Sequence, residues 1–89
     1  MKIKSGFVLR EMANGVSVVV GVGDKAKELK GYLTLNESGA LIWKVLQKGG
    51  ELEDVVLAIL SEYDVDRELA TKDATLVIKK LREIGALDD

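Results

Sequence analysis

The chain has 89 residues, 47% of them hydrophobic and 31% charged, which suffices for one small hydrophobic core, so we expect a single domain over residues 1–89. Because it contains no cysteine and no histidine, it has no disulfide, no thiolate or imidazole metal ligand and no Cys-His or Ser-His nucleophile pair; we therefore predict a protein that is not an enzyme and holds no metal or cofactor. The net charge of −2 argues against a nucleic-acid backbone as partner, and the lack of a membrane-length apolar run or signal-peptide core predicts a cytoplasmic protein.

The amino-terminal part predicts a sheet. Residues 7–12 and 16–22 are rich in β-branched and other apolar side chains, and Asn14-Gly15 separates them. An Asn-Gly pair between two such runs is a strong hairpin signal, because both residues tolerate a positive φ angle. Residues 23–30 are polar and flanked by glycines, which is typical of a loop with at most one helical turn. A third strand is expected at residues 32–35, which completes a three-stranded antiparallel meander.

Three helices are expected after this sheet. Asn36 is a good N-cap for the first helix, whose apolar stripe includes Trp43 as a core residue. Residues 51–54 open the second helix with acids near its amino end, and apolar residues then recur three and four apart. Asp66 is expected to cap the third helix and Gly85 to stop it.

The third helix has two faces on a helical wheel. One apolar stripe is wide enough to face the core, whereas Leu69 and Leu76 lie on a flank beside Asp73, Lys80 and Ile84. Two leucines on a mixed apolar and charged flank indicate either a binding groove or packing beneath the loop or the second helix, and the wheel does not decide between them.

These elements assemble into an α+β fold of winged helix-turn-helix type, a three-stranded antiparallel sheet followed by three helices. The third strand, residues 32–35, contains no charge and no proline, the two devices that often protect a sheet edge. Either this strand lies inside the sheet, or its edge is left open so that another chain can add a strand there. In the second case Leu69, Leu76 and Ile84 would line a trough for the added strand, and Lys80 would meet its acids.

The same residues carry a resemblance to a known family. The string Gly31-Tyr-Leu-Thr-Leu-Asn-Glu-Ser-Gly-Ala40, followed by Ile42-Trp43, is similar to the signature of the PqqD family, whose domain is also called the RiPP recognition element. The similarity continues through Leu52-Glu-Asp-Val-Val56, residues 62–65, Asp73 and Leu81 with Gly85-Ala86-Leu87, and it includes Phe7-Val-Leu-Arg10. It therefore covers nearly the whole chain, as one PqqD-like peptide-binding domain.

The resemblance implies a peptide chaperone rather than a catalyst. Such proteins bind the leader segment of a ribosomally synthesised precursor peptide by β-strand addition and present it to a modifying enzyme, often a radical SAM protein. Carried over to this chain, the resemblance implies that the leader binds at strand positions Tyr32, Leu33, Thr34 and Leu35 and at third-helix positions Asp73, Leu76, Val77 and Lys80, with Leu69 on the same flank. Residues 24–30 lack the proline-containing approach expected in members that make pyrroloquinoline quinone, so the product is left open.

A winged-helix DNA-binding regulator is the alternative from a different class, since one fold serves many functions. It would need a basic recognition helix, but the third helix mixes Lys79, Lys80 and Arg82 with Glu68 and other acids, and the Asn14-Gly15 turn is uncharged. An open edge beside an apolar groove would also allow two copies to pair as a homodimer in the absence of peptide.

Overall fold

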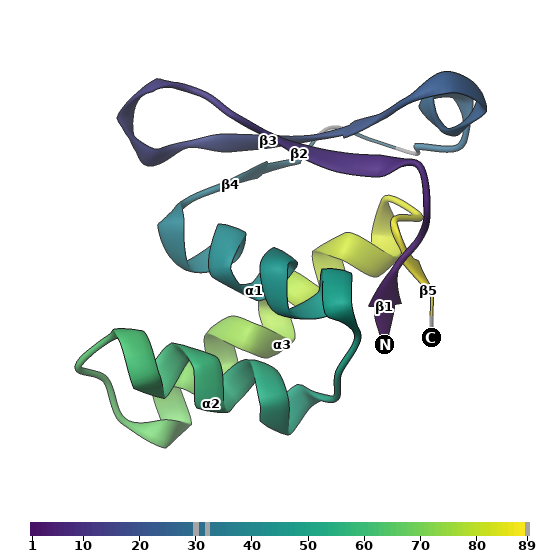
Figure 1. The fold of residues 1–89 in the computed structure, drawn as a ribbon. Helices are drawn as coiled ribbons and strands as arrows, with labels where there is room; N and C mark the ends of the chain where they lie inside the picture. Colours follow the sequence, from purple (N-terminus) through teal and green to yellow (C-terminus); the bar gives the residue numbers. More distant parts are fainter. Residues whose placement is uncertain (30, 32, 89) are drawn as a thin grey trace.

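The computed structural model describes residues 1–29, 31 and 33–88, which form a sheet laid across a layer of helices (Figure 1). Strands β2 (Phe7–Glu11), β3 (Ser17–Gly21) and β4 (Thr34–Leu35) pair antiparallel in the order β2-β3-β4. Helices α1 (Glu37–Lys48), α2 (Leu52–Glu62) and α3 (Arg67–Glu83) follow. The predicted α+β fold, a three-stranded antiparallel meander followed by three helices, is confirmed.

The β2–β3 hairpin forms at the predicted Asn-Gly pair. Asn14 and Gly15 have φ angles of 62° and 72°, and they lie in a single 3-10 turn that spans Ala13–Gly15. The Met12 N–H donates to the Val16 carbonyl oxygen at 2.7 Å and closes the hairpin. Both central residues therefore adopt the left-handed conformation that asparagine and glycine tolerate better than other residues.

Each predicted cap of the helical layer is present. The Asn36 Oδ1 accepts from the Gly39 N–H at 2.9 Å at the start of α1, and the Asp66 Oδ1 accepts from the Leu69 N–H at 2.8 Å at the start of α3. Gly85 ends α3 with a φ angle of 83°, and the next residue, Ala86, donates its N–H to the Leu81 carbonyl oxygen at 3.0 Å. These bonds satisfy backbone groups that lack a partner inside the helix.

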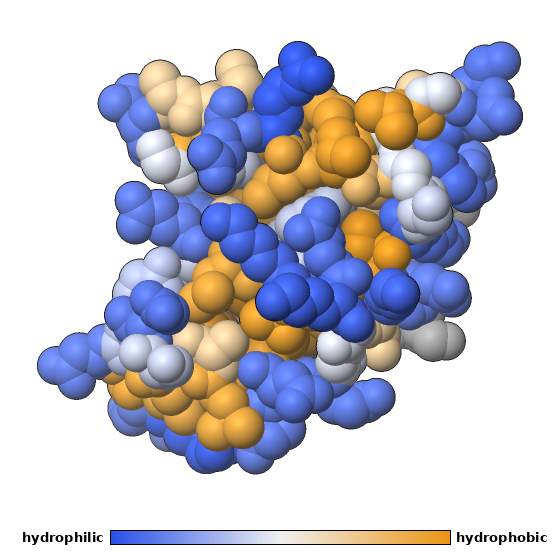
Figure 2. Space-filling view, in the orientation of Figure 1, coloured by the Kyte–Doolittle hydropathy of each residue, from blue (hydrophilic) through white to orange (hydrophobic). Residues whose placement is uncertain are grey.

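The hydrophobic core lies between the sheet and the helices. Trp43 is fully buried there, as predicted, and its indole Nε1 has no hydrogen-bond partner among the described residues. Figure 2 shows that apolar side chains also reach the surface on one face, in a band from the sheet down between the layers, with charged side chains around them. The largest fully buried side chains are those of Val19, Ile42, Trp43, Leu46, Val55, Val56 and Leu81.

Two short strands were not expected from the sequence. β1 (Lys2–Ile3) and β5 (Leu87–Asp88) pair antiparallel, with Lys2 opposite Asp88 and Ile3 opposite Leu87. This second sheet brings the two ends of the chain side by side below the main sheet (Figure 1). The polar loop after β3 contains one 3-10 segment, Gly23–Lys27, in agreement with the single helical turn allowed for it.

No helix in the described part of the chain has the length and apolar character needed to cross a membrane.

Candidate functional site

Strand β4 forms one edge of the three-stranded sheet. Among the described residues it pairs with β3 alone, with Ser17 opposite Leu35 and Val18 opposite Thr34. The Val19 N–H donates to the Leu33 carbonyl oxygen at 3.0 Å, so the backbone groups of Leu33 point toward β3. Because successive residues of a strand direct these groups to opposite sides, the N–H and C=O of Thr34 point to the open edge. Of the two arrangements considered for this strand, the open edge is the one observed.

The side chains of residues 33–35 alternate between the core and the solvent. Leu33 and Leu35 are buried in the core, whereas Thr34 is exposed. The leucines therefore hold the strand in place and do not offer a side-chain surface to a partner. Their amides face β3, so a proline at either position would damage the sheet itself, and Thr34 is the residue at which the free edge can be tested. Tyr32, the remaining predicted strand position, lies outside the described residues.

A groove runs between β4 and α3. It encloses about 190 Å³, and Thr34 and Leu35 form one wall while Asp73, Leu76, Val77 and Lys80 form the other. The helical wheel placed Asp73, Leu76 and Lys80 on one flank, whereas Val77 was expected only from the family resemblance; the structure brings all four beside the open edge.

The α3 wall of this groove combines two apolar and two charged residues. Leu76 is 51% exposed although it lies next to a half-buried Val77. Leu69 is 45% exposed and does not line the groove, because it lies one turn before Asp73 on the helix. The reading in which both leucines pack beneath the loop or α2 is therefore wrong, and Leu76 is the leucine that faces the edge.

Ile84 was expected to line the groove, but it does not. It is only 8% exposed, and a Cβ atom added at Gly31 would be 3.3 Å from its Cγ2 atom. Ile84 follows the last residue of α3, so the turn at Gly85 directs it into the core rather than along the wheel. Since Asp73 lies near Asn36 and Ile84 lies near Gly31, α3 runs antiparallel to β4.

Opposite charges mark the two ends of the groove. Asp73 lines the depression together with Asn36 and Ser38, where β4 ends. Lys80 is seven residues later, which places it about 10 Å further along the helix axis, toward the beginning of β4. An extended peptide in the groove would thus meet a carboxylate at one end and an ammonium group at the other.

Three further groove residues were not predicted as binding positions: Asn36, Ser38 and Gly39. They belong to the cap of α1, where the Asn36 Oδ1 accepts from both the Ser38 Oγ and the Gly39 N–H at 2.9 Å. A Cβ atom at Gly39 would lie 3.0 Å from the Leu35 Cβ, so only glycine lets α1 begin this close to the strand. The sequence could have indicated these groove residues, because the capping residue Asn36 directly follows the strand.

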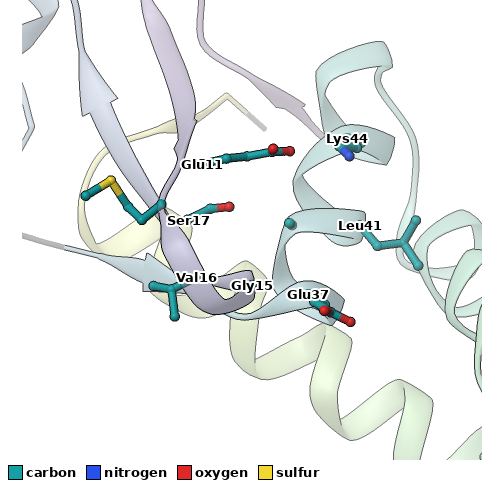
Figure 3. A pocket seen from close by; sticks show the side chains of 9 residues that line it. Glu11, Gly15, Val16, Ser17, Glu37, Leu41 and Lys44 are labelled. Atoms are coloured by element: carbon teal, nitrogen blue, oxygen red, sulfur yellow. The ribbon is translucent and has the colours of Figure 1, made fainter.

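Another hollow, of about 350 Å³, lies on the other side of the hairpin tip, between the hairpin and α1. Glu11 and Lys44 approach it from opposite walls, and Glu37 lies at its lower rim (Figure 3). No group of three or more acidic residues that could hold a metal ion occurs among the described residues. The acidic residues of this hollow therefore do not form a metal centre in the described part of the chain.

One titratable group outside both hollows is perturbed. The Lys25 ammonium lies 2.8 Å from the Glu28 carboxylate in the loop before β4, and its hydrogen bond lowers the pKa of Glu28. Both side chains are solvent-exposed or nearly so, and a surface pair of this kind contributes little to stability.

Comparison with known proteins agrees with this geometry. Residues 18–87 match the family model described as coenzyme PQQ synthesis protein D (PqqD). No curated protein matches the chain by sequence. The structure of TbiB1 in complex with the TbiA(beta) leader peptide is similar, with 28% identity and a TM-score of 0.69, over 99% of this chain and 100% of that one.

A second similar structure is that of lasso peptide synthetase B1 complexed with the leader peptide, with 27% identity and a TM-score of 0.70. The match covers 96% of this chain and 93% of that one. Because the family model spans more than half of the sequence and both structures share the fold along nearly its whole length, the chain belongs to the PqqD family.

Proposed function

We propose that this protein binds the leader segment of a ribosomally synthesised precursor peptide as an additional strand on β4 and presents it to a modifying enzyme. The observation that carries the proposal is the open, uncharged edge of β4 facing a groove along α3. Both similar structures described above are complexes with leader peptides, which supports the same ligand class here.

The backbone of Thr34 would provide the first contacts. Its N–H and C=O point away from β3, so an added strand can form two main-chain hydrogen bonds with this one residue. Each such bond contributes only about 0.5–1.5 kcal/mol net, so the backbone alone gives weak and unselective binding. Selectivity must come from side chains that enter the groove.

The α3 flank would supply that selectivity. Leu76 and Val77 offer an apolar floor, and Asp73 and Lys80 offer one charge of each sign. We further propose that Tyr32 extends the edge at its amino end and that Leu69 contacts a longer peptide beyond the groove. Leu33 and Leu35 act from the core side by fixing the strand.

The edge is held rigid at its carboxyl end. Leu35 is followed directly by Asn36, whose side chain caps α1, and Gly39 packs against Leu35. A preorganised strand loses less conformational entropy on binding than a loop of the same length. Short as it is, β4 is therefore a suitable template for an incoming chain.

The partner enzyme would carry out the chemistry. The sequence lacks histidine and cysteine, and we propose that residues 1–89 act as one non-catalytic, cytoplasmic adaptor domain whose partner is a modifying enzyme such as a radical SAM protein. In the absence of peptide, two copies can satisfy their open edges by pairing as a homodimer.

The test begins by searching the neighbouring reading frames for a short precursor-like peptide, whose leader segment then serves as the ligand. Binding is measured by isothermal titration for the wild type, for Thr34→Pro and for Glu11→Pro. Thr34→Pro removes one donor at the open edge and should weaken binding roughly ten- to a hundredfold, since the opposing carbonyl is left unpaired. Glu11→Pro removes an outward-facing amide on the opposite edge and should bind like the wild type. Equal binding by a folded Thr34→Pro variant would exclude strand addition at β4.

A further inference from the structure

The groove beside β4 continues past the end of the strand. A hollow of about 430 Å³ lies between the tip of the β2–β3 hairpin and the carboxyl end of α2. It is called the second hollow below, and it is distinct from the hollow beside Glu11 and Lys44. Asn36, Ser38 and Asp73 line both the second hollow and the groove. The two are therefore parts of one depression, and a chain that lies along β4 and runs on past Asn36 enters the second part.

The floor of this hollow is apolar. Ile59 from α2, Tyr63 at the C-cap of α2 and Val65 from the following loop line it. Ile59 is buried, while Tyr63 and Val65 are half-buried and pack against the core. Small-ligand sites usually enclose about 300–1,000 Å³, so the volume is sufficient for an aromatic or large aliphatic side chain together with its backbone.

The opposite wall is the hairpin tip, which rests on the start of α1. A Cβ atom at Gly15 would lie only 3.0 Å from the Glu37 Oε1 atom. Asn14 and Val16 flank this contact and also line the hollow. Because the tip is in contact with a capped helix, the wall is part of the folded structure and does not depend on a ligand.

The charges around the depression are unequal along its length. The carboxylates of Glu37 and Asp73 line the second hollow, and none of the described residues around it is basic. Lys80 lies at the far end of the groove, beside β4. A peptide that matches this pattern carries a basic residue at the hollow and an acidic residue near Lys80.

The direction of the peptide follows from the sheet. Every strand pair in the β2-β3-β4 sheet is antiparallel, and antiparallel pairing is the more frequent and slightly more stable mode. A peptide antiparallel to β4 runs from the Asn36 end toward the Thr34 end. Its amino-terminal flank is then the part that enters the hollow, roughly two to four residues before the residue opposite Thr34.

We propose that this hollow is a second subsite of the peptide groove, which takes an aromatic or large aliphatic side chain with a neighbouring lysine or arginine. The subsite serves the segment immediately amino-terminal to the one that pairs with β4. This inference rests on the proposed function, because it requires a peptide on β4.

A displayed library of random peptides of about 12 residues tests the proposal, since at about 3.3 Å per residue such a peptide spans both the edge and the hollow. Selection on the wild-type protein should enrich peptides in which an aromatic or large aliphatic residue with an adjacent basic residue precedes an alternating strand segment that ends in an acid. Enriched peptides with the reverse order, or with no preference in the amino-terminal flank, would overturn the proposal.

Single variants then show which residues of the protein select the amino-terminal flank of the peptide. Tyr63→Ala should weaken binding of a selected peptide at least about fivefold and abolish the penalty for removing its amino-terminal flank, as expected for loss of a buried aromatic contact. Leu57→Ala, which truncates an exposed α2 side chain outside the hollow, is the matched control and should change neither. If Tyr63→Ala unfolds, amide chemical-shift changes in the wild type replace it: the flank must shift Ser38 and Val65, and no shift there contradicts the subsite.

The strand-addition site and the second subsite can be distinguished by these experiments. If selected peptides bind and lose affinity with Thr34→Pro, yet are indifferent to their amino-terminal flank, the strand-addition site stands and the second subsite is wrong. If no peptide is enriched, or if binding survives Thr34→Pro, strand addition fails and the subsite fails with it.

Discussion

The two edges of the sheet are built differently. β2 is five residues long, and the hydrogen bonds from Met12 to Val16 and from Val22 to Gly6 show that its alternate residues Phe7, Leu9 and Glu11 direct their amides outward. Charged Arg10 and Glu11 lie at its exposed end, which is a common protection against unwanted pairing. The edge at β4 has neither a charge nor a proline and borders a groove. The β2 edge thus carries a common protection against pairing that the β4 edge lacks.

The strongest test of this contrast removes the inner support of β4. Leu35 is 5% exposed, and Leu35→Ala should lower the free energy of unfolding by about 2–5 kcal/mol through lost burial and a cavity. Val8→Ala on β2, where the side chain is 37% exposed, should cost under about 1 kcal/mol. Urea denaturation monitored by Trp43 fluorescence gives both values. Equal costs would mean that β4 is not held by its leucines.

Gly39→Val changes the contact between α1 and the strand. The new side chain would collide with Leu35, and overpacking of this kind should cost about 1–3 kcal/mol. Ala40→Val introduces the same β-branched side chain one position later, where it is half-buried, and should cost roughly 0.5–1 kcal/mol from helix propensity alone. Denaturation midpoints of the two variants separate steric displacement of the edge from a general effect on the helix.

Leu76→Ser tests peptide binding by a side chain that lies outside the hydrophobic core. Since Leu76 is 51% exposed, the variant should unfold like the wild type, while leader affinity should fall roughly five- to tenfold because peptide no longer buries the leucine. Leu57→Ser removes an equally exposed leucine that does not line the groove and should leave affinity unchanged. Titration calorimetry measures both affinities, and a similar loss in the two variants would point to nonspecific hydrophobic contact.

Asn36→Ala should have the smallest effect of the series. Losing the bond to the Gly39 N–H should cost about 1 kcal/mol of stability, and Asn36→Asp should restore most of it because aspartate caps equally well. Hydrogen exchange of the amides in the first turn of α1 reports the fraying directly. Unchanged protection in Asn36→Ala would show that packing of Gly39 alone fixes the start of the helix.

Local signals in the sequence were sufficient for most of the fold. Asn14-Gly15 specified the hairpin, and Asn36, Asp66 and Gly85 marked helix boundaries, because each of these residues satisfies a requirement of its own backbone. Nothing local marked the pairing of β1 with β5. Two-residue strands carry no periodicity, and their partners are at opposite ends of the chain.

Helical periodicity predicted the α3 part of the candidate site, but only within the helix itself. The wheel placed Asp73, Leu76 and Lys80 on one flank correctly, but it extended the helix past its end and so misplaced Ile84. The strand residues were identified without their orientation. Which amide faces the open edge depends on the register with β3, and register is a property of the pair rather than of either sequence alone.

The pairing of β1 with β5 has a practical consequence for engineering. Since Lys2 lies opposite Asp88, a short linker could join the present ends, and new ends could be opened at an exposed loop such as that around Gly23. Such a circular permutant would keep every strand pair of the main sheet within one chain. It would also let a reporter be attached at a chosen distance from β4, so that occupancy of the edge could be read optically.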